Sequence, residues 1–397
     1  MTGVSVVLVG CGAPLKSMGW YHATQILNEG SNIAARLDFI VEPWFLSEAG
    51  KTSPGGSEFA EFKQTLEESR GVKFFSRVED VPPVEKGVKR LAIISAREYL
   101  TLFSSVYDGA PNTISPITLH LLFVSIHPGT SDNPRLFASC LDIKANAIFL
   151  EKPGAPSVSE LEAMMDNARK MGVLVYMGFN KNVSKFSSKA RQCANSNGGT
   201  ITYLHNNNYE ESPESLGECF ERNSEGMLKN MAIHELALAV TFYGVSVDNI
   251  ASVDADKEYS RCLTLKGPSG KSFTDFSKLK FTIKTKDGKE VSIAADRCGG
   301  DDSVGIVTDK GGKEIARFTM PDDEDAATIK GAEERIAGAM PYFYVQDPDY
   351  ATLKRRVAQA IVEDDPSAAE GVATIDVAVH ALEISEYLTP ILMEQLK

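Results

Sequence analysis

The stretch VSVVLVGCGAPLKSMGWYHATQIL, residues 4–27, decides the fold. It begins with the apolar run Val4–Val9, which predicts a strand buried on both faces of a parallel sheet. The pair Gly10 and Gly12 follows, and after a loop Gly19 leads into a segment of helical character, Trp20–Leu27. A strand, a Gly-x-Gly turn and a helix are the opening of a βαβ unit that binds a dinucleotide.

The turn and the start of the helix are suited to a pyrophosphate. Glycines let the backbone turn sharply and approach the anion, and the helix N-terminus offers free N–H groups. We therefore expect Gly10, Cys11, Gly12 and Gly19 at a cofactor. Six residues separate Gly12 from Gly19, more than the usual spacing, so an ordinary strand–turn–helix remains the alternative interpretation.

An acidic residue ends the second predicted strand, Leu37–Val41. Glu42 at that position would accept hydrogen bonds from the adenosine ribose and would repel a 2′-phosphate. The sequence thus favours NAD as the cofactor. Lys16 in the long glycine loop keeps NADP possible, and a solvated strand end is the alternative for Glu42.

Bulk properties restrict the class of protein. A chain of 397 residues predicts two domains, and a net charge of −13 disfavours nucleic acid or an anionic membrane as a partner. There is no apolar run of membrane-spanning length and no secretory signal pattern, so we expect a cytoplasmic protein. The six scattered cysteines indicate reduced thiols and predict no metal site.

Two runs compete for one strand of the first domain. Arg90–Ser95 and Leu119–Ile126 both look like buried strands, and the fold needs one of them before a helix at about 134–143 and the strand Ala147–Leu150. Removing residues 98–129 closes the βαβ unit cleanly. We therefore interpret 98–129 as an insertion in a first domain that covers residues 1–180.

The rhythm of the sequence changes in residues 181–397. Short, turn-separated and partly alternating strands predict a mostly antiparallel sheet, and a helical segment is expected from about Glu225 to Phe242. Two amphipathic helical stretches close the chain.

Polar groups with catalytic potential follow the strands of the first domain. Glu151, Lys152 and Pro153 end one strand and Asn180 follows the next, and the carboxyl ends of parallel strands share one edge of the sheet. Asn230 and His234 are spaced i and i+4, which predicts one face of a helix. A lysine can polarise a hydroxyl and a histidine can exchange its proton near neutral pH. Weaker pocket candidates are Lys181, Asn206 and Asn208.

Several motifs together resemble one oxidoreductase family. They are GCG with GWYH at 10–22, VEP at 41–43, FLEKPGAPSVSELEAMMDNARKMGVLVYMGFNKN at 149–182, GMLKNMAIHELAL at 226–238 and AEGVATIDVAVHALEIS at 369–385. With these the chain is similar to the Gfo/Idh/MocA oxidoreductases. The resemblance implies a Rossmann domain and a C-terminal α/β domain with a large, mostly antiparallel sheet. It also implies that the C-terminal domain, residues 181–397, holds the substrate and forms a homo-oligomer, dimer or tetramer, through that sheet.

The resemblance also implies roles for single residues. Lys152 matches the lysine that holds the substrate hydroxyl near the nicotinamide, and His234 matches the catalytic histidine. Glu151 and Pro153 match the strand end beside the nicotinamide. Asn230 stands where the family often has aspartate, and with Asn180 it would orient the substrate.

The function implied is hydride transfer between NAD(P) and a small polar alcohol or ketone such as a sugar or cyclitol. The Asn230 departure, together with a missing Pro-x-x-x-His after the fourth strand, motivates an alternative. In that alternative the protein binds a dinucleotide without catalysis, as a sensor or regulatory protein.

Overall fold

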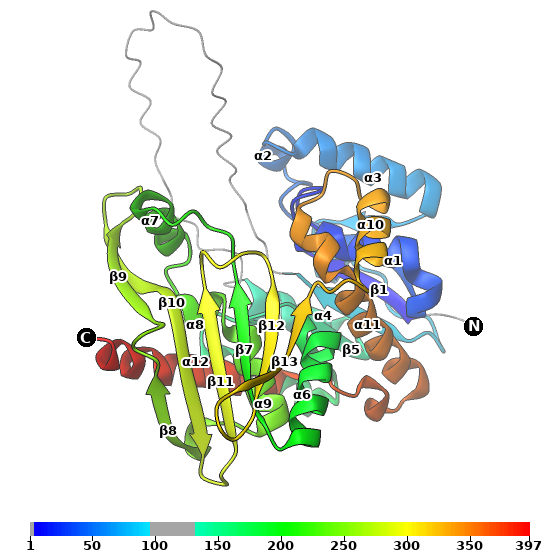
Figure 1. Ribbon diagram of the computed structural model, residues 1–397. Coiled ribbons are helices and arrows are strands. Elements are labelled where there is room, and N and C mark those ends of the chain that lie inside the picture. The colour runs from blue at the N-terminus through cyan, green and yellow to red at the C-terminus, as the bar shows by residue number, and fades with distance from the viewer. Residues whose placement is uncertain (1–3, 96–131) are drawn as a thin grey trace, which may run out of the picture.

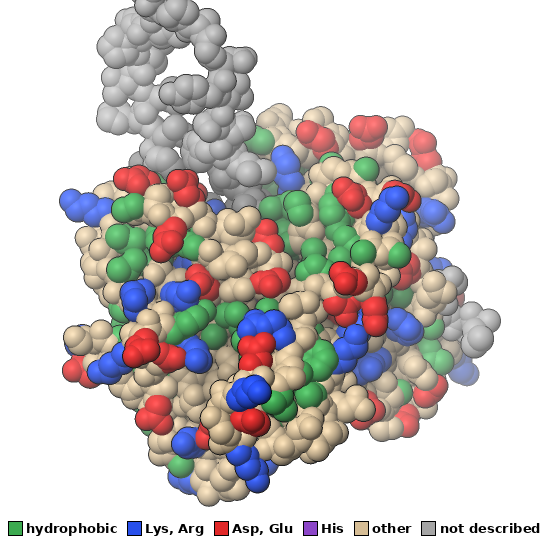
Figure 2. All heavy atoms as spheres, in the orientation of Figure 1, with side chains coloured by type: hydrophobic (Ala, Val, Ile, Leu, Met, Phe, Trp, Pro, Cys, Tyr) green, Lys and Arg blue, Asp and Glu red, His purple; other side chains and the backbone are tan. Residues whose placement is uncertain are grey.

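The computed structural model describes residues 4–95 and 132–397, which form two sheets with helices packed around them (Figure 1). Acidic and basic side chains are interspersed over the face seen in Figure 2, with small apolar areas between them. Among the described residues, none of the helices combines the length and the apolarity that crossing a membrane requires.

The first sheet is wholly parallel and has the strand order β3-β2-β1-β4-β5-β6. Its strands are β1 (Val4–Val9), β2 (Ala35–Val41), β3 (Lys73–Phe75), β4 (Arg90–Ile94), β5 (Ala147–Leu150) and β6 (Leu174–Met177). The helical segments of this half are α1 (Met18–Ile33), α2 (Glu48–Lys51), α3 (Gly56–Arg70), η1 (Val78–Asp80), α4 (Asn133–Asp142) and α5 (Val158–Met171).

Strand β1 shows why the sheet is covered on both faces. Val4, Val6 and Leu8 belong to one buried cluster with helices α1 and α3, whereas Val7 and Val9 belong to a second cluster with α4 and α5. Successive side chains of a strand point to opposite faces, so an uninterrupted apolar run needs helices on both. The predicted doubly wound domain is confirmed.

The second sheet has the order β13-β12-β7-β11-β10-β8, and β9 pairs with β10. Strands β7 and β11 are parallel, while the other neighbouring pairs are antiparallel, which confirms the predicted mostly antiparallel sheet. The strands are β7 (Thr200–Asn206), β8 (Ile250–Ala255), β9 (Arg261–Lys266), β10 (Ser272–Thr285), β11 (Glu290–Asp296), β12 (Ser303–Thr308) and β13 (Glu314–Met320). The helical segments around it are η2 (Asn180–Val183), α6 (Lys185–Asn197), α7 (Pro213–Arg222), α8 (Met227–Asn230), α9 (Ile233–Tyr243) and η3 (Val247–Asn249).

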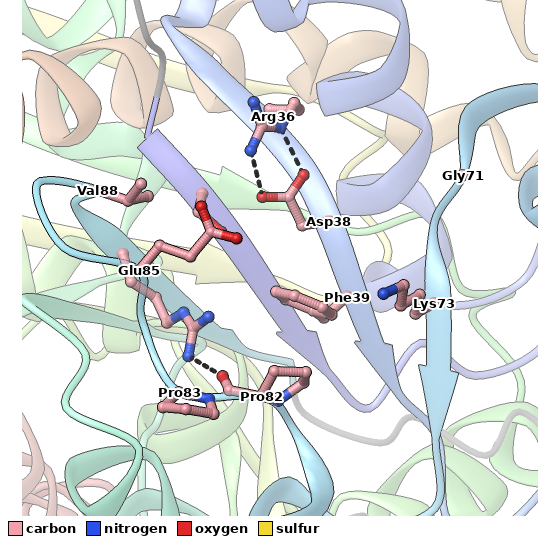
Figure 3. A pocket seen from close by; sticks show the side chains of 11 residues that line it. Arg36, Asp38, Phe39, Gly71, Lys73, Pro82, Pro83, Glu85 and Val88 are labelled. Carbon is pink, nitrogen blue, oxygen red and sulfur yellow. Dashed lines mark hydrogen bonds and ion pairs between the residues drawn. The ribbon is translucent and has the colours of Figure 1, made fainter.

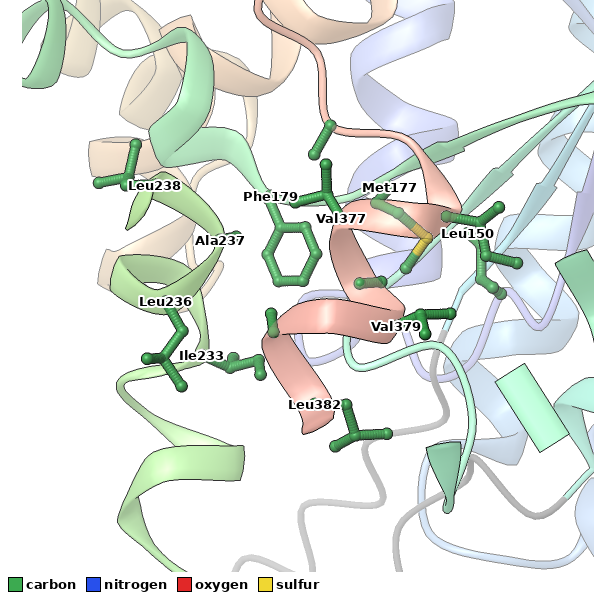
Figure 4. Close-up of a cluster of buried hydrophobic side chains, with 14 of the residues drawn as sticks. Leu150, Met177, Phe179, Ile233, Leu236, Ala237, Leu238, Val377, Val379 and Leu382 are labelled. Carbon is green, nitrogen blue, oxygen red and sulfur yellow. The ribbon is translucent and has the colours of Figure 1, made fainter. Parts of the chain in front are cut away.

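The C-terminal part of the chain joins the two halves. After α10 (Ala326–Arg335), helix α11 (Pro341–Glu363) packs on α1 of the first half, and η4 (Pro366–Ala369) follows. Helix α12 (Ile375–Gln395) then contacts α5 and α9. Figure 4 shows Val377, Val379 and Leu382 of α12 among apolar side chains of both halves. One core therefore continues from the parallel sheet into the second half, and the domain boundary at residue 180 stays a prediction.

The helix expected from Glu225 to Phe242 is wrong as a single element. The structure has two helices there, α8 and α9, separated by Met231 and Ala232. The expectation that Asn230 and His234 share one helix face is therefore also wrong. The contacts that interrupt the helix are described with the site below.

Of the two predicted strands, Arg90–Ser95 is confirmed, and Leu119–Ile126 lies outside the described residues. Arg90–Ile94 is β4, which pairs with β1 on one side and with β5 on the other. The proposed insertion, 98–129, lies outside the described residues, and its interpretation as an insertion stays a prediction.

Candidate active site

The predicted site residues gather at the carboxyl edge of the parallel sheet. The glycine turn follows β1, Glu151–Pro153 follows β5, and Asn180 follows β6. Strand β1 lies between β2 and β4, so the chain winds away from it in both directions. Such a topological switch point at the carboxyl edge is where open α/β sheets bind ligands.

The glycine turn is closed tightly onto helix α1. A Cβ atom at Gly19 would lie 1.9 Å from the carbonyl oxygen of Gly10, so a larger residue cannot occupy position 19 without moving the helix. Ser17 lies just before α1, and its Oγ donates to the carbonyl oxygens of Cys11 at 2.6 Å and Ala13 at 2.8 Å. The extra loop residues thus form a compact turn, and the N-terminus of α1 still points at the end of β1.

The Glu42 carboxylate links the tip of β2 to this turn. It is 1% exposed, and it accepts hydrogen bonds from the backbone N–H of Gly12 at 2.8 Å and of Trp44 at 3.0 Å. Phe45 N–H donates to the same carboxylate at 3.4 Å. A carboxylate has about four lone-pair positions, so three backbone donors leave room for one further donor. The contact with a ribose hydroxyl stays a prediction.

Cys11 and Lys16 also belong to this turn, and their side chains differ in exposure. Cys11 is fully buried, and burial together with the charge of Glu42 raises the pKa of its thiol. Only the backbone of Cys11 is therefore suited to contact a cofactor. Lys16 is exposed at the surface of the loop.

Glu151 connects the end of β5 with helices α1 and α11. Its Oε1 lies 2.8 Å from Nε2 of His22, and the hydroxyl of Tyr350 donates to its Oε2 at 3.3 Å. A Cβ atom at Gly178 would lie 2.5 Å from the carboxylate, so a larger residue there would displace the Glu151 carboxylate. Burial raises the pKa of Glu151 to about 7, although the nearby charges of Lys354 and Lys152 oppose the rise.

This raised pKa gives a testable pH dependence of stability. Between the usual value of 4.5 and about 7 the folded state keeps the proton that the unfolded state has released. The free energy of unfolding should therefore fall as the pH rises through that window, by up to about 1.4 kcal/mol per pH unit. Urea denaturation of the wild type and of Glu151→Gln measures this, and the difference in slope between the two reports on Glu151, because Asp349, whose pKa is raised to about 8, titrates in both proteins. Equal slopes in the wild type and the variant would contradict the raised pKa of Glu151.

The side chain of Lys152 contacts the backbone where helix α8 ends and α9 begins. Its Nζ donates to the backbone carbonyl of Asn230 at 3.4 Å, and Nδ1 of His205 lies 3.0 Å from the carbonyl of Met231. Both carbonyls thus bond to side chains from other elements, which explains why the helix does not continue. The Asn230 side chain donates instead to Glu225 at 3.1 Å. Asn230 therefore positions Lys152 through its main chain.

A buried cluster of charged and polar side chains lies beside Lys152. Lys181 donates to Oε1 of Glu235 at 2.6 Å, and His205 lies 3.4 Å from Oε2 of the same carboxylate. Burial alone would raise the pKa of Glu235, but Lys181 and His205 hold it well below its usual value. Burial lowers the pKa of Lys181, and Glu235 opposes that shift. Glu235 is thus the counter-ion of this cluster.

His234 stands in this cluster as a neutral base. Burial lowers its pKa well below 6.5, and the positive charges of Lys152 and Lys181 lower it further. Its ring meets Phe179 edge-on with the centroids 5.7 Å apart. Within residues 4–95 and 132–397, Nδ1 of His234 is buried and has no hydrogen-bond partner, and the same holds for Nδ2 of Asn180. Buried polar atoms without partners are uncommon, so these two atoms are candidates for contact with a ligand.

Removing the counter-ion should cost much of the stability. Glu235→Ala leaves the Lys181 ammonium buried and unpaired, so we expect a loss of about 3–5 kcal/mol in the free energy of unfolding. The matched control is Glu67→Ala, which breaks the partly exposed Lys63–Glu67 pair and should cost no more than about 1 kcal/mol. Urea denaturation of both variants measures these losses. Equal losses in the free energy of unfolding would contradict the role of Glu235 as the buried counter-ion.

Sequence analysis missed Glu235 and His205 and undervalued Lys181. Glu235 is the one acidic residue in the run Ile233–Val240, which is apolar apart from Glu235 and His234, and this signal could have been used. The weaker candidates Asn206 and Asn208 donate to Asp302 and Asp301. Asn206 follows His205 directly in β7 and so faces the opposite side of the sheet.

The comparisons with known proteins agree with this architecture. No family model matches the chain. The chain is 24% identical over 142 residues to the myo-inositol 2-dehydrogenase of Thermotoga maritima, a match that spans 35% of this chain and 42% of the relative. The chain therefore aligns with less than half of that curated relative.

Solved structures match over nearly the whole chain. A probable dehydrogenase from Thermotoga maritima superposes with a TM-score of 0.60 at 16% identity and covers 99% of this chain and 98% of its own. The chain has the fold of the Gfo/Idh/MocA oxidoreductases. The myo-inositol dehydrogenase of Lactobacillus casei, solved with NAD(H) and myo-inositol, has the same Gfo/Idh/MocA fold, with a TM-score of 0.58 at 13% identity over 100% of this chain and 96% of its own. The predicted resemblance is confirmed at the level of the fold.

Proposed function

We propose that the protein is an NAD-dependent oxidoreductase that interconverts a secondary alcohol and a ketone on a small polar substrate. The observation that carries this proposal is the buried, unpartnered Nδ1 of the neutral His234 beside Lys152 at the carboxyl edge of the parallel sheet. The similar proteins named as inositol dehydrogenases support a polyol or cyclitol as the substrate class.

The nucleotide half fits a dinucleotide. Helix α1 packs closely against the glycine turn because Gly19 has no side chain. Its N-terminal N–H groups would therefore lie near a pyrophosphate bound beyond the end of β1. The Asn180 amide offers an unpaired Nδ2 on the same edge. A carboxylate at the tip of β2 favours NAD over NADP, because Glu42 would repel a 2′-phosphate. The position of Glu42 beside the glycine turn therefore supports NAD as the proposed cofactor.

A bound nicotinamide would supply the hydride acceptor, and the chain would handle the proton. His234 is neutral at neutral pH and has a nitrogen that can take the hydroxyl proton of the substrate. Within the described residues Lys152 makes one long hydrogen bond, and its further N–H donors would stabilise developing negative charge on the substrate oxygen. Lys181 and Glu235 would keep the cluster rigid and close to neutral.

The test is oxidation of a panel of polyols that includes myo-inositol, with NAD⁺ as oxidant and formation of NADH as the readout. Turnover that depends on both NAD⁺ and a polyol is the expected result. The second candidate function is a dinucleotide-binding sensor, which is favoured by asparagine instead of aspartate at position 230. NADH binding without turnover on any polyol or ketone of the panel would favour that candidate.

A further inference from the structure

A cavity of about 270 Å³ lies at the amino edge of the parallel sheet, opposite the carboxyl edge that carries the candidate active site (Figure 3). Residues at the starts of four neighbouring strands line it: Ser5 of β1, Arg36 of β2, Lys73 of β3 and Arg90 of β4. Parallel strands begin at one edge and end at the other, so this cavity is separate from the glycine turn and from Lys152. The proposed function does not use this cavity.

Arg90 is a buried cation with too few partners. It is 3% exposed, and its Nη1 donates to the carbonyl of Pro82 at 2.9 Å. Its Nε is buried without a hydrogen-bond partner, and within residues 4–95 and 132–397 no carboxylate lies at ion-pair distance from it. Burial lowers its pKa, with Asp38 opposing the shift. A guanidinium has five N–H donors, and buried charges are normally paired.

Of the carboxylates that line the cavity, Asp38 is paired with a cation of the same cavity. Asp38 binds Arg36 through two hydrogen bonds, at 2.5 and 3.0 Å, and the charge of Glu85 also acts on Arg36. Lys73 forms no ion pair with any residue of the described chain. Lys73 and Arg90 are therefore the cations of the cavity that lack a carboxylate partner.

The cavity also has an apolar surface. The guanidinium of Arg90 lies 5.3 Å from the ring centroid of Phe39, and Phe39 pairs with Lys73 between β2 and β3. Figure 3 shows Phe39 between the Arg36–Asp38 pair and the turn at Pro82 and Pro83. A flat or apolar group would contact the Phe39 ring while an anionic group meets the cations.

We propose that this cavity binds a small organic anion, with its carboxylate or phosphate group between Lys73 and Arg90 and its apolar part against Phe39. The volume is close to the lower end of the range for small-molecule pockets, which restricts the ligand to a small metabolite. An oxyanion there supplies Arg90 with the charge-assisted hydrogen bonds it lacks. Binding is independent of the dinucleotide, because the two sites lie at opposite edges of the sheet.

The experiment is isothermal titration calorimetry of the full chain with phenyl phosphate, which carries both an oxyanion and a ring. We expect saturable binding that a chloride salt of equal ionic strength does not reproduce. Lys73→Met should weaken the binding by about tenfold or more, as expected for the loss of a charge-assisted contact. The matched control is Lys86→Met, which removes the same charge from an exposed residue that does not line the cavity, and it should leave Kd within about twofold.

Three results would overturn the proposal. They are the absence of saturable binding, equal Kd values for Lys73→Met and Lys86→Met, and displacement of phenyl phosphate by NADH, which would assign the probe to the glycine turn. None of these readouts uses turnover. The anion site and the proposed oxidoreductase activity can therefore fail separately.

Discussion

Replacing Lys152 by methionine should lower kcat for polyol oxidation by a factor of about 10²–10⁴, the usual contribution of a positioned proton-transfer or polarising group. Methionine keeps most of the volume of the side chain and removes the ammonium, so the loss reports on the charge and its N–H donors. Steady-state kinetics with NAD⁺ and the best polyol of the panel is the measurement. The Kd for NADH should change by less than about threefold, because Lys152 acts on the substrate oxygen.

The matched control for this variant is Lys229→Met. Lys229 is also a lysine of this region, in α8 next to Asn230, but its Nζ pairs with Glu386 at 2.6 Å. Its replacement should leave kcat within about twofold. Unchanged turnover in Lys152→Met would remove Lys152 from the mechanism, and equal losses in the two variants would show that any lysine near α8 has the same effect.

Replacing His234 by phenylalanine should have a similarly large effect on kcat, a loss of about 10²–10⁴. Phenylalanine preserves an aromatic ring beside Phe179 and removes both nitrogens, so the stability should change less than the rate. Kinetics and urea denaturation of the same preparation separate these two effects. His380→Phe is the control, since His380 is exposed and pairs with Glu383 at 2.9 Å.

The pH profile of the wild type tests the same residue. Because the pKa of His234 lies well below 6.5, the ring stays neutral as the pH falls from 8 to 6.5. Loss of the base form of His234 should therefore not lower the rate of alcohol oxidation in that range. A fall of the rate with an apparent pKa of 6.5, present in the wild type and absent from His234→Phe, would contradict the account of its environment.

Local signals in the sequence were enough to predict the half of the protein that contains the parallel sheet. The apolar run of β1, the glycines after it and Glu42 after β2 are features of adjacent residues, and they were found where expected. The chain positions of Glu151 and Asn180 also follow from strand order, since every strand of a parallel sheet ends at the same edge. These predictions needed no knowledge of contacts between distant segments.

The details of the candidate site depend on such distant contacts. The sequence from Gly226 to His234 has helical character. The helix is interrupted after Asn230, where the side chains of Lys152 and His205, which come from other parts of the chain, contact the backbone carbonyls of Asn230 and Met231. Likewise, the pairing of Lys181 with Glu235 joins residues 54 positions apart. Propensity and periodicity describe neighbours along the chain, so they do not predict which carbonyl a lysine from another strand will bind.

The proposed NAD site is tested by titration of the purified protein with NADH and with NADPH, followed by nicotinamide fluorescence. We expect saturable NADH binding and much weaker NADPH binding, because the glycine turn and α1 would receive the pyrophosphate while Glu42 would repel a 2′-phosphate. Tighter binding of NADPH would contradict the role of Glu42. Absence of binding by either nucleotide would contradict the proposed oxidoreductase function as a whole.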